Sequence, residues 1–273
     1  DRVMRVLKTV LAPGQPPSTA GSYGYVTYNL FRTQVRSMSV AAYAVNVDGL
    51  QMGSGVDARL LPTGFATADF FALLGVSPVL GRFYTADEDA PNSTQQVAVI
   101  GYGLWQRLFG GERDVIGKQI PLANKTYTIV GVAPRGFFGT TVGARASVFV
   151  PITMPNGLTG PVARIYFPNH DNRLSYWAHL FARLKPGVTR EQAAAALNPL
   201  YHAIVSEGEA PVLTGVTEQE LETFRTRPLV LEPGARGQTS PNRTLDPARN
   251  SLELLLAVSG AVLLLCCANV AGL

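Results

Sequence analysis

The sequence is poor in cysteine and histidine, with two and three among 273 residues. Cys266 and Cys267 are adjacent, and neighbouring cysteines rarely form a disulfide with each other. The chain before them is free of cysteine, which is compatible with an oxidising compartment but does not require one. The histidines His170, His179 and His202 share no metal-ligand spacing. The sequence therefore predicts no metal site.

Charged residues are also scarce, at 15% of the chain, and the formal net charge is +4. Proteins that bind nucleic acid gather Lys and Arg on one face or in one run. Here the basic residues are scattered, and the closest pairs (Arg225 with Arg227, Arg243 with Arg249) are too sparse to follow a phosphate backbone. We therefore expect no nucleic-acid partner. The 47% of apolar residues is that of a globular chain.

Motifs of common catalytic sites are missing as well. Residues 110–119 superficially resemble a phosphate-binding loop, but the glycine spacing is one residue too long and Gln119 stands where Ser or Thr is needed. No Gly-x-Ser-x-Gly motif occurs. The acidic residues 87–89 follow Thr85, which with Glu88 has the pattern of a capping box. We interpret this run as a cap or a solvated loop, rather than a calcium or acid–base site. The sequence predicts no catalytic residue, no cofactor-binding residue and no metal ligand, and we expect no enzyme.

One long apolar run is present, at residues 254–273 (LLLAVSGAVLLLCCANVAGL), and it carries no charge. A helix of this length spans about 30 Å, the thickness of the hydrocarbon core of a bilayer. Small residues such as Gly260 and Gly272 would allow close packing of a second helix. Asn269 is expected to face that helix or a water-lined path. We predict a transmembrane helix at the end of a fragment of a longer protein, because a buried helix of a soluble domain would be shorter and amphipathic.

Local patterns before this run predict both strands and helices. Alternating apolar residues predict strands at 2–10, 40–48, 56–60, Val97–Ile100, 118–122, 126–132, 147–151, 176–184 and 229–231. Apolar spacings of three and four predict helices at 23–37, 68–74, Tyr102–Phe109 and from 189 onward. The segments 12–21, 49–55 and 156–172 are rich in Gly, Pro or polar residues and are expected to be loops or turns.

Individual residues refine these predictions. Gly75 is placed to cap a helix in the left-handed conformation. Thr189 and Gln192 form a capping box, and Pro199 should kink or end the helix that follows. His179 alternates with apolar neighbours along a strand and is expected to be partly buried, whereas His202 is expected at the surface of the late helix.

Two strand–helix–strand units, early and late, bracket a middle of mixed strands, which predicts an α+β domain with an inserted subdomain. We place one subdomain at residues 1–80 and 172–240 and the inserted one at 81–171. A polar linker at 241–253 would lead to the membrane helix at 254–273.

Four stretches, in this order, resemble one known family. They are FATADFFALLGVSPVLGRFYTADED (65–89), VAVIGYGLWQRLFGGERDVIGKQIPLANKTYTIVGVAPRGF (97–137), LFARLKPGVTREQAAAAL (180–197) and the apolar run with its Cys-Ala-Asn-Val-Ala segment (254–273). Over nearly its whole length the chain resembles the MacB-like periplasmic core domain of ABC-type permeases, joined to the start of an FtsX-like permease segment.

The resemblance implies a two-subdomain periplasmic domain, with paired β-α-β units and an inserted strand-rich subdomain, on residues 1–250. It implies a bacterial inner-membrane location, with one membrane helix before residue 1 and further spans at and beyond the tail. The implied partners are an ATP-binding subunit or domain of an ABC transporter, a second permease copy, a periplasmic adaptor protein and membrane lipid. ATPase signatures are absent, so ATP hydrolysis would belong to another domain or subunit. The implied function is to couple ATP-driven motion to export or extraction of a substrate.

Two other functions remain open at this point. A membrane-anchored module that senses or binds a ligand would need the same tail, and a kinase-like coiled coil after residue 273 would favour it over further membrane spans. A membrane-anchored hydrolase is disfavoured because the sequence offers no nucleophile with a nearby base and no metal set.

Overall fold

The computed structural model describes residues 2–10, 18–123, 125–154, 171–238, 254–260 and 262–263. The chain divides into two compact units, Asp1–Gln238 and Thr239–Leu273. In the second unit the described residues are helical and exposed. None of the helices in the described part of the chain is long and apolar enough to cross a membrane. The predicted linker 241–253 and most of the predicted span 254–273 lie outside the described residues, so both stay predictions.

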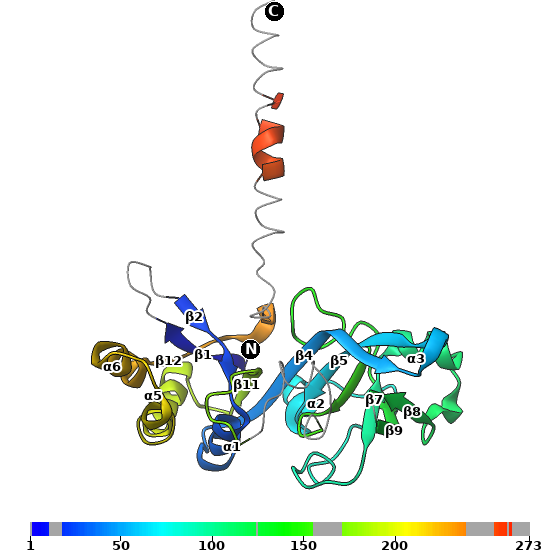
Figure 1. Cartoon of the computed structure of the whole chain (residues 1–273), viewed down its shortest axis with the longest axis horizontal. Coiled ribbons are helices and arrows are strands. Elements are labelled where there is room, and N and C mark those ends of the chain that lie inside the picture. The colour runs from blue at the N-terminus through cyan, green and yellow to red at the C-terminus, as the bar shows by residue number, and fades with distance from the viewer. Residues whose placement is uncertain are drawn as a thin grey trace, which may run out of the picture. The chain divides into compact units, whose positions relative to one another are not determined.

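The first unit is built on one mixed sheet of 12 strands (Figure 1). Its main path runs β12-β1-β11-β4-β5-β10-β7-β9-β6, with β2 beside β1, β3 beside β11, and β8 beside both β4 and β9. The strands are β1 (Val3–Val10), β2 (Ser18–Ala20), β3 (Ser22–Tyr23), β4 (Met38–Met52), β5 (Arg59–Ala66), β6 (Leu80–Gly81), β7 (Val97–Ile100), β8 (Gln119–Leu122), β9 (Lys125–Val132), β10 (Val148–Pro151), β11 (Ala178–Leu184) and β12 (Leu229–Pro233).

Strand β4 joins two parts of the sheet: a first part with β12, β1 and β11, and a second part with β5, β10, β7, β9 and β6. Its first residues pair with β11, and from Tyr43 onward it pairs with β5. The pairing with β5 shifts between Asn46 and Leu50, where the Asn46 side chain accepts hydrogen bonds from the amides of Asp48 and Gly49. Gly49 has φ +86°, and a Cβ there would lie 2.6 Å from the backbone of Leu61. The predicted strand at 40–48 is therefore too short, because this bulge lets β4 continue through the segment predicted as a turn.

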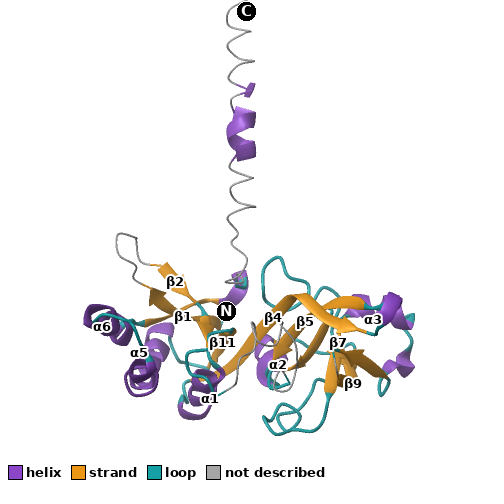
Figure 2. Cartoon of the chain, viewed as in Figure 1, coloured by secondary structure: helices purple, strands orange, loops and turns teal. Residues whose placement is uncertain are grey.

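The helices cover the sheet in two groups (Figure 2). Helices α1 (Tyr25–Gln34), α5 (Arg190–Ala203) and α6 (Glu218–Thr226) lie beside β1, β11 and β12, whereas α2 (Asp69–Leu74) and α3 (Tyr102–Phe109) lie in the part that contains β5, β7 and β9. Phe70 of α2 stacks on Tyr43 of β4 with ring centres 4.7 Å apart, and Phe71 stacks on Phe83, just after β6, at 3.9 Å. Tyr43, Phe70 and Phe71 belong to the second of two apolar cores, and Phe83 packs against it.

Several local predictions are confirmed. Strand β7 and helix α3 have the predicted bounds, and Gly75 ends α2 in the predicted left-handed conformation. Gly110 ends α3 in the same way. The capping box of Thr189 and Gln192 is formed at the start of α5. Pro199, however, does not end that helix: α5 continues to Ala203 and passes into a π-helix, Ile204–Glu209.

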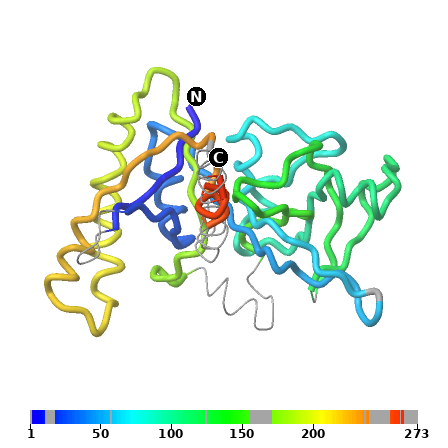
Figure 3. Tube along the Cα trace, turned by 90° about the horizontal axis from the view of Figure 1, so that it is seen from above, coloured from blue at the N-terminus to red at the C-terminus, as the bar shows by residue number. Residues whose placement is uncertain are grey.

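The predicted subdomains, 1–80 with 172–240 and 81–171, are joined by this one sheet. Strand β5, on one side of the predicted boundary, pairs in parallel with β10 on the other side. Viewed from above, β1, β11 and β12 with helices α1, α5 and α6 lie on one side, and β5, β7 and β9 with helices α2 and α3 lie on the other (Figure 3). Strand β4 passes from one side to the other (Figure 3). The subdomain division therefore falls within a continuous sheet, and it stays a prediction.

Candidate functional site

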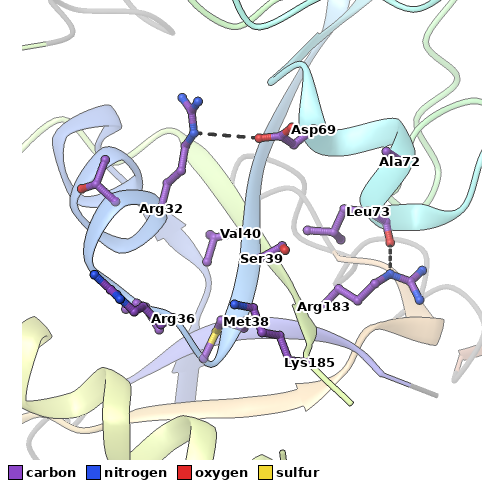
Figure 4. Close-up of a pocket in the computed structure, with 12 residues that line it drawn as sticks. Arg32, Arg36, Met38, Ser39, Val40, Asp69, Ala72, Leu73, Arg183 and Lys185 are labelled. Atoms are coloured by element: carbon purple, nitrogen blue, oxygen red, sulfur yellow. Dashed lines mark hydrogen bonds and ion pairs between the residues drawn. The ribbon is translucent and has the colours of Figure 1, made fainter.

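A pocket of about 530 Å³ lies between α1 and α2 (Figure 4). Strands β4 and β11 supply the rest of its wall. Its lining combines cations, small polar groups and apolar side chains: Arg32, Thr33, Val35, Arg36, Met38, Ser39, Val40, Asp69, Ala72, Leu73, Arg183 and Lys185. Four of these side chains are cationic and one is acidic, which distinguishes the pocket from the weakly charged chain as a whole.

The cations follow from local structure. Arg32 lies in the last turn of α1, where a positive charge is favoured by the helix dipole. Met38 and Val40 are buried and the intervening Ser39 is exposed, as the alternation of a strand predicts, and all three residues line the pocket. Arg183 of β11 is the direct partner of Ser39 across the pair β4–β11, which places both side chains on the same face.

Two of the four cations have partners within the pocket wall. Arg32 Nε is 3.9 Å from a carboxylate oxygen of Asp69, an exposed pair that links α1 to α2. Arg183 Nε donates a hydrogen bond of 2.6 Å to the backbone oxygen of Leu73, near the end of α2. Among the described residues, Arg36 and Lys185 form no ion pair, and both side chains are exposed. In Figure 4, Arg32, Arg36, Lys185 and Arg183 lie on different sides of Ser39 and Val40.

A second pocket, of about 490 Å³, lies next to α3. Its polar lining includes three arginines, Arg107, Arg135 and Arg145, and no acidic residue. The guanidinium of Arg145 sits 5.0 Å from the ring centre of Phe138, so part of this wall is a cation–π contact.

A buried ionic cluster surrounds Glu209, the last residue of the π-helix. Its carboxylate accepts hydrogen bonds from the hydroxyls of Tyr176, at 2.6 Å, and of Thr27, at 3.5 Å. Arg227, just after α6, places its guanidinium 3.7 Å away. Burial raises the pKa of Glu209, and the nearby hydroxyls and cations oppose that rise. The cluster therefore links α1, the π-helix and the turn before β12.

Lys8 of β1 completes this cluster from the sheet side. Its ammonium lies 3.6 Å from the ring centre of Tyr176, and Lys8 as a whole is only 4% exposed. Burial lowers the pKa of Lys8 to about 7, with a further contribution from the charge of Arg227. Positions 8, 176, 209 and 227 are far apart in the sequence, and no local motif pointed to them. Lys8 and Glu209 are buried and Tyr176 and Arg227 are half-buried, so the cluster is suited to holding elements together rather than to admitting a substrate.

The acidic run at 87–89 has a structural role. Glu88 binds the guanidinium of Arg82 through both carboxylate oxygens and accepts a hydrogen bond from the amide of Thr85. The predicted capping pattern is thus formed, but it closes a turn rather than starting a helix. The alternative of a solvated loop is wrong for Glu88 and for Asp89, which are 4% and 8% exposed.

Asp89 is held beneath the start of α2. Its carboxylate accepts the amide proton of Ala68 at 3.1 Å, and the hydroxyl of Thr153 lies 3.4 Å from its other oxygen. Burial raises the pKa of this carboxyl to about 7, against the opposing effect of these hydrogen bonds.

Neither of the two described histidines, His179 and His202, belongs to a group that could hold a metal ion. His179 is buried as expected; burial lowers its pKa to about 4, while a hydrogen bond with the backbone of Gly21 opposes the change. The prediction of a surface position for His202 is wrong, since the side chain is half-buried in α5. His170 lies outside the described residues. In the described part of the chain, no three His, Cys, Asp or Glu side chains are grouped to hold a metal ion.

The segment that leaves the sheet after β12 is bonded to both parts of the first unit. On one side, Pro233 pairs with Met4 of β1, and Arg5 donates a hydrogen bond of 2.9 Å to the backbone oxygen of Gly237. On the other side, Gln238 bridges to Thr141, with backbone hydrogen bonds to Thr140 and Val142 and a side-chain bond of 3.0 Å to the Thr141 hydroxyl. We call residues 233–238 the exit segment.

The fold is similar to solved extracytoplasmic domains of transporters. The periplasmic region of MacB from Actinobacillus actinomycetemcomitans has a TM-score of 0.56 and 13% identity, with 92% of each chain covered. The extracellular domain of the ABC-type transporter YknZ from Gram-positive bacteria has a TM-score of 0.50 and 13% identity, with 72% of this chain and 91% of that chain covered. At these identities the similarity establishes the fold. No curated protein matches the chain.

The family is established by the amino-acid sequence. Residues 2–200 match the MacB-like periplasmic core domain, which is most of the described first unit. The chain therefore belongs to this family, the periplasmic domains of MacB/FtsX-like ABC-transporter permeases.

Proposed function

We propose that this domain couples ATP-driven motion of membrane helices to the export or extraction of a substrate across or from the membrane. Membership of an ABC-transporter family supports an ATP-binding partner. The domain itself would perform no catalysis, and ATP hydrolysis would reside in a separate domain or subunit.

The bonding of the exit segment is the observation that carries this proposal. Because residues 233–238 are hydrogen-bonded to β1 and to residues 140–142, a displacement of the chain after Gln238 acts on both parts of the sheet at once. The continuous strand β4 and the pair β5–β10 would then carry that displacement through the whole domain. Interiors of packed domains have low compressibility and transmit strain, which such coupling requires.

The remaining parts of the proposal rest on the sequence. The apolar run 254–273 would be a transmembrane helix in the bacterial inner membrane, contacting lipid and other helices of the permease. A second permease copy would form a dimer with this chain, and a periplasmic adaptor protein is a further partner that the family resemblance implies.

The test is whether the domain moves during the ATPase cycle. Spin labels would be placed on cysteines at Val56, in the turn between β4 and β5, or at Val212, three residues after the π-helix. Both side chains are exposed, and Cys266 and Cys267 would be replaced by serine. In membranes containing the full-length permease and its ATPase, we expect the distance between labels on two copies to change between the nucleotide-free and vanadate-trapped states.

Gly237→Val tests whether the exit segment transmits this motion. A Cβ at Gly237 would lie 2.4 Å from the backbone oxygen of Thr140 and would displace the exit segment. The variant should reduce the change in distance while ATP hydrolysis continues. Identical distances in both states for both label positions would refute the coupling function.

A membrane-anchored ligand-binding module remains a second candidate function. The observation that favours it is the cationic pocket between α1 and α2, which has room for a small ligand. Ligand binding without any change in distance during the ATPase cycle would favour this function over coupling.

A further inference from the structure

The pocket between α1 and α2 contains more positive charge than its own residues neutralise. Asp69 is the one acidic residue in its lining, against Arg32, Arg36, Arg183 and Lys185. The pair Arg32–Asp69 is long, at 3.9 Å, and exposed, so it holds Arg32 only weakly. A cleft lined by charge of one sign raises the local concentration of ions of the opposite sign.

Two of the cations are free to move toward a ligand. Arg36 and Lys185 have exposed side chains and no ion pair among the described residues. Arg183, by contrast, is fixed at one nitrogen by the oxygen of Leu73 and keeps further donors on its guanidinium. The pocket therefore combines a positioned donor with adjustable ones.

The floor of the pocket is partly apolar. Val35, Met38, Val40 and Leu73 contribute to the lining, and Ser39 adds a hydroxyl between them. An anion with an apolar part would therefore find partners for both parts, whereas a strongly hydrated small anion would use the cations alone.

The charge of the pocket and its type of hydrogen-bond donor indicate which class of anion it would bind. Arginine is the preferred residue for bidentate recognition of phosphate and carboxylate, and three of the four cations are arginines. A phosphate group carries up to about two negative charges near neutral pH, which matches the surplus in the pocket better than a single carboxylate.

We infer that the pocket between α1 and α2 binds a phosphate-bearing ligand, with Arg36 and Lys185 as its adjustable contacts and Arg183 as its fixed one. A bound ligand would also link α1 to α2, in addition to the ion pair of Arg32 with Asp69. The inference concerns a binding site and does not depend on the proposed coupling function.

The experiment is calorimetric titration of the full chain in nonionic detergent, without any ATPase. The probes are pyrophosphate, for a free phosphate compound, and dihexanoyl phosphatidylglycerol below its micelle concentration, for a lipid headgroup. Dihexanoyl phosphatidylcholine serves as the zwitterionic control. We expect the chain to bind at least one of the two anionic probes, and the double variant R36E/K185E to bind it at least tenfold more weakly.

The matched control is R107E/R135E, which makes the same change in net charge in the second arginine-rich pocket. Its affinity should stay within twofold of the unchanged chain. Tighter binding of phosphatidylglycerol than of pyrophosphate would identify a lipid headgroup as the source of the phosphate, and the reverse would identify a soluble phosphate compound.

The inference is overturned if neither anionic probe binds, if phosphatidylcholine binds as tightly as phosphatidylglycerol and pyrophosphate does not bind, or if both double variants lose affinity equally. Circular dichroism would check folding of each variant. If R36E/K185E does not fold, R36Q/K185Q removes the charges more gently and should still weaken binding several-fold, and unchanged affinity in that variant would refute the site.

Discussion

Buried carboxyl groups are the most informative single residues of this domain. Asp89 and Glu209 lie under α2 and at the end of the π-helix, and burial raises the pKa of each. Glu209 has Lys8 and Arg227 as nearby cations, whereas Asp89 is held by the amides of Ala68 and Thr153 and the Thr153 hydroxyl, and the charge of Arg32 acts on it without an ion pair. A buried charge without a close counter-ion is costly, so Asp89 should weaken the fold whenever it is ionised.

The predicted effect of Asp89→Asn depends on pH. The pKa of Asp89 is about 7 in the folded chain and 3.8 as the reference value. Between these values the folded state holds a proton that the unfolded state has lost, so the free energy of unfolding falls as pH rises from 4 to 7. Asparagine stays neutral. The variant should therefore gain stability over the unchanged chain above pH 7, by at most about 4 kcal/mol, and little at pH 4.

Urea unfolding of the full chain at pH 4.5, 6 and 8 measures this difference. Asp87→Asn, in the exposed neighbour of the same run, is the matched control and should leave the pH dependence unchanged. A pH-independent difference between Asp89→Asn and the unchanged chain would mean that Asp89 keeps its proton affinity near the unfolded value.

At the scale of elements, two helices begin with the same capping box and differ in burial. Thr189 and Gln192 start α5, which buries Ala193, Leu197 and Tyr201. Thr217 and Glu220 start α6, which buries no residue. The same local signal therefore begins a helix that supports the core and one that lies on the surface.

Removing each cap should separate these roles. Thr189→Ala should lower the free energy of global unfolding by about 1 kcal/mol, the usual effect of losing an N-cap side chain. Thr217→Ala should instead speed hydrogen exchange of the α6 amides and leave the denaturation midpoint nearly unchanged, because no residue of α6 is fully buried and the helix can open locally. Equal losses of global stability in both variants would show that α6 unfolds only with the whole domain.

The elements that the sequence predicts correctly are those whose signals come from residues close together in the chain. Helix α3 and its cap Gly110 are set by neighbouring residues, and the sequence predicts their bounds correctly. Helix α6 begins with an equally local capping box at Thr217 and Glu220, a signal from which its start could be predicted. The pocket could not be predicted, because it joins the end of α1, the start of β4 and the end of β11, whose positions are decided by strand pairing.

At the scale of the whole molecule, the sheet connects regions that the sequence divides into two subdomains. Strands β4, β5 and β11 pair within the first predicted subdomain, and β5 also pairs with β10 of the second, across the predicted boundary at residue 80. Gln238 adds a second connection, from the end of the exit segment to Thr141. Separating the regions would break strand pairs and expose apolar residues of both cores, so we expect the first unit to unfold in one step.

The two tryptophans of the chain report on this directly. Trp105 lies in α3, in the second part of the sheet, and Trp177 lies just before β11, in the first. In Trp105→Phe the fluorescence follows Trp177, and in Trp177→Phe it follows Trp105. Within each variant we expect the fluorescence and the far-ultraviolet circular dichroism to change at the same urea concentration. Because the two signals are compared within one variant, any effect of the substitution on stability cancels.

If Trp105 and Trp177 instead depart from the dichroism curve in opposite directions, the regions unfold separately, and the division at residue 80 describes two independent subdomains. Coincident curves would mean that the two regions unfold as one cooperative unit, which the proposed coupling requires of a sheet that carries a displacement from the exit segment.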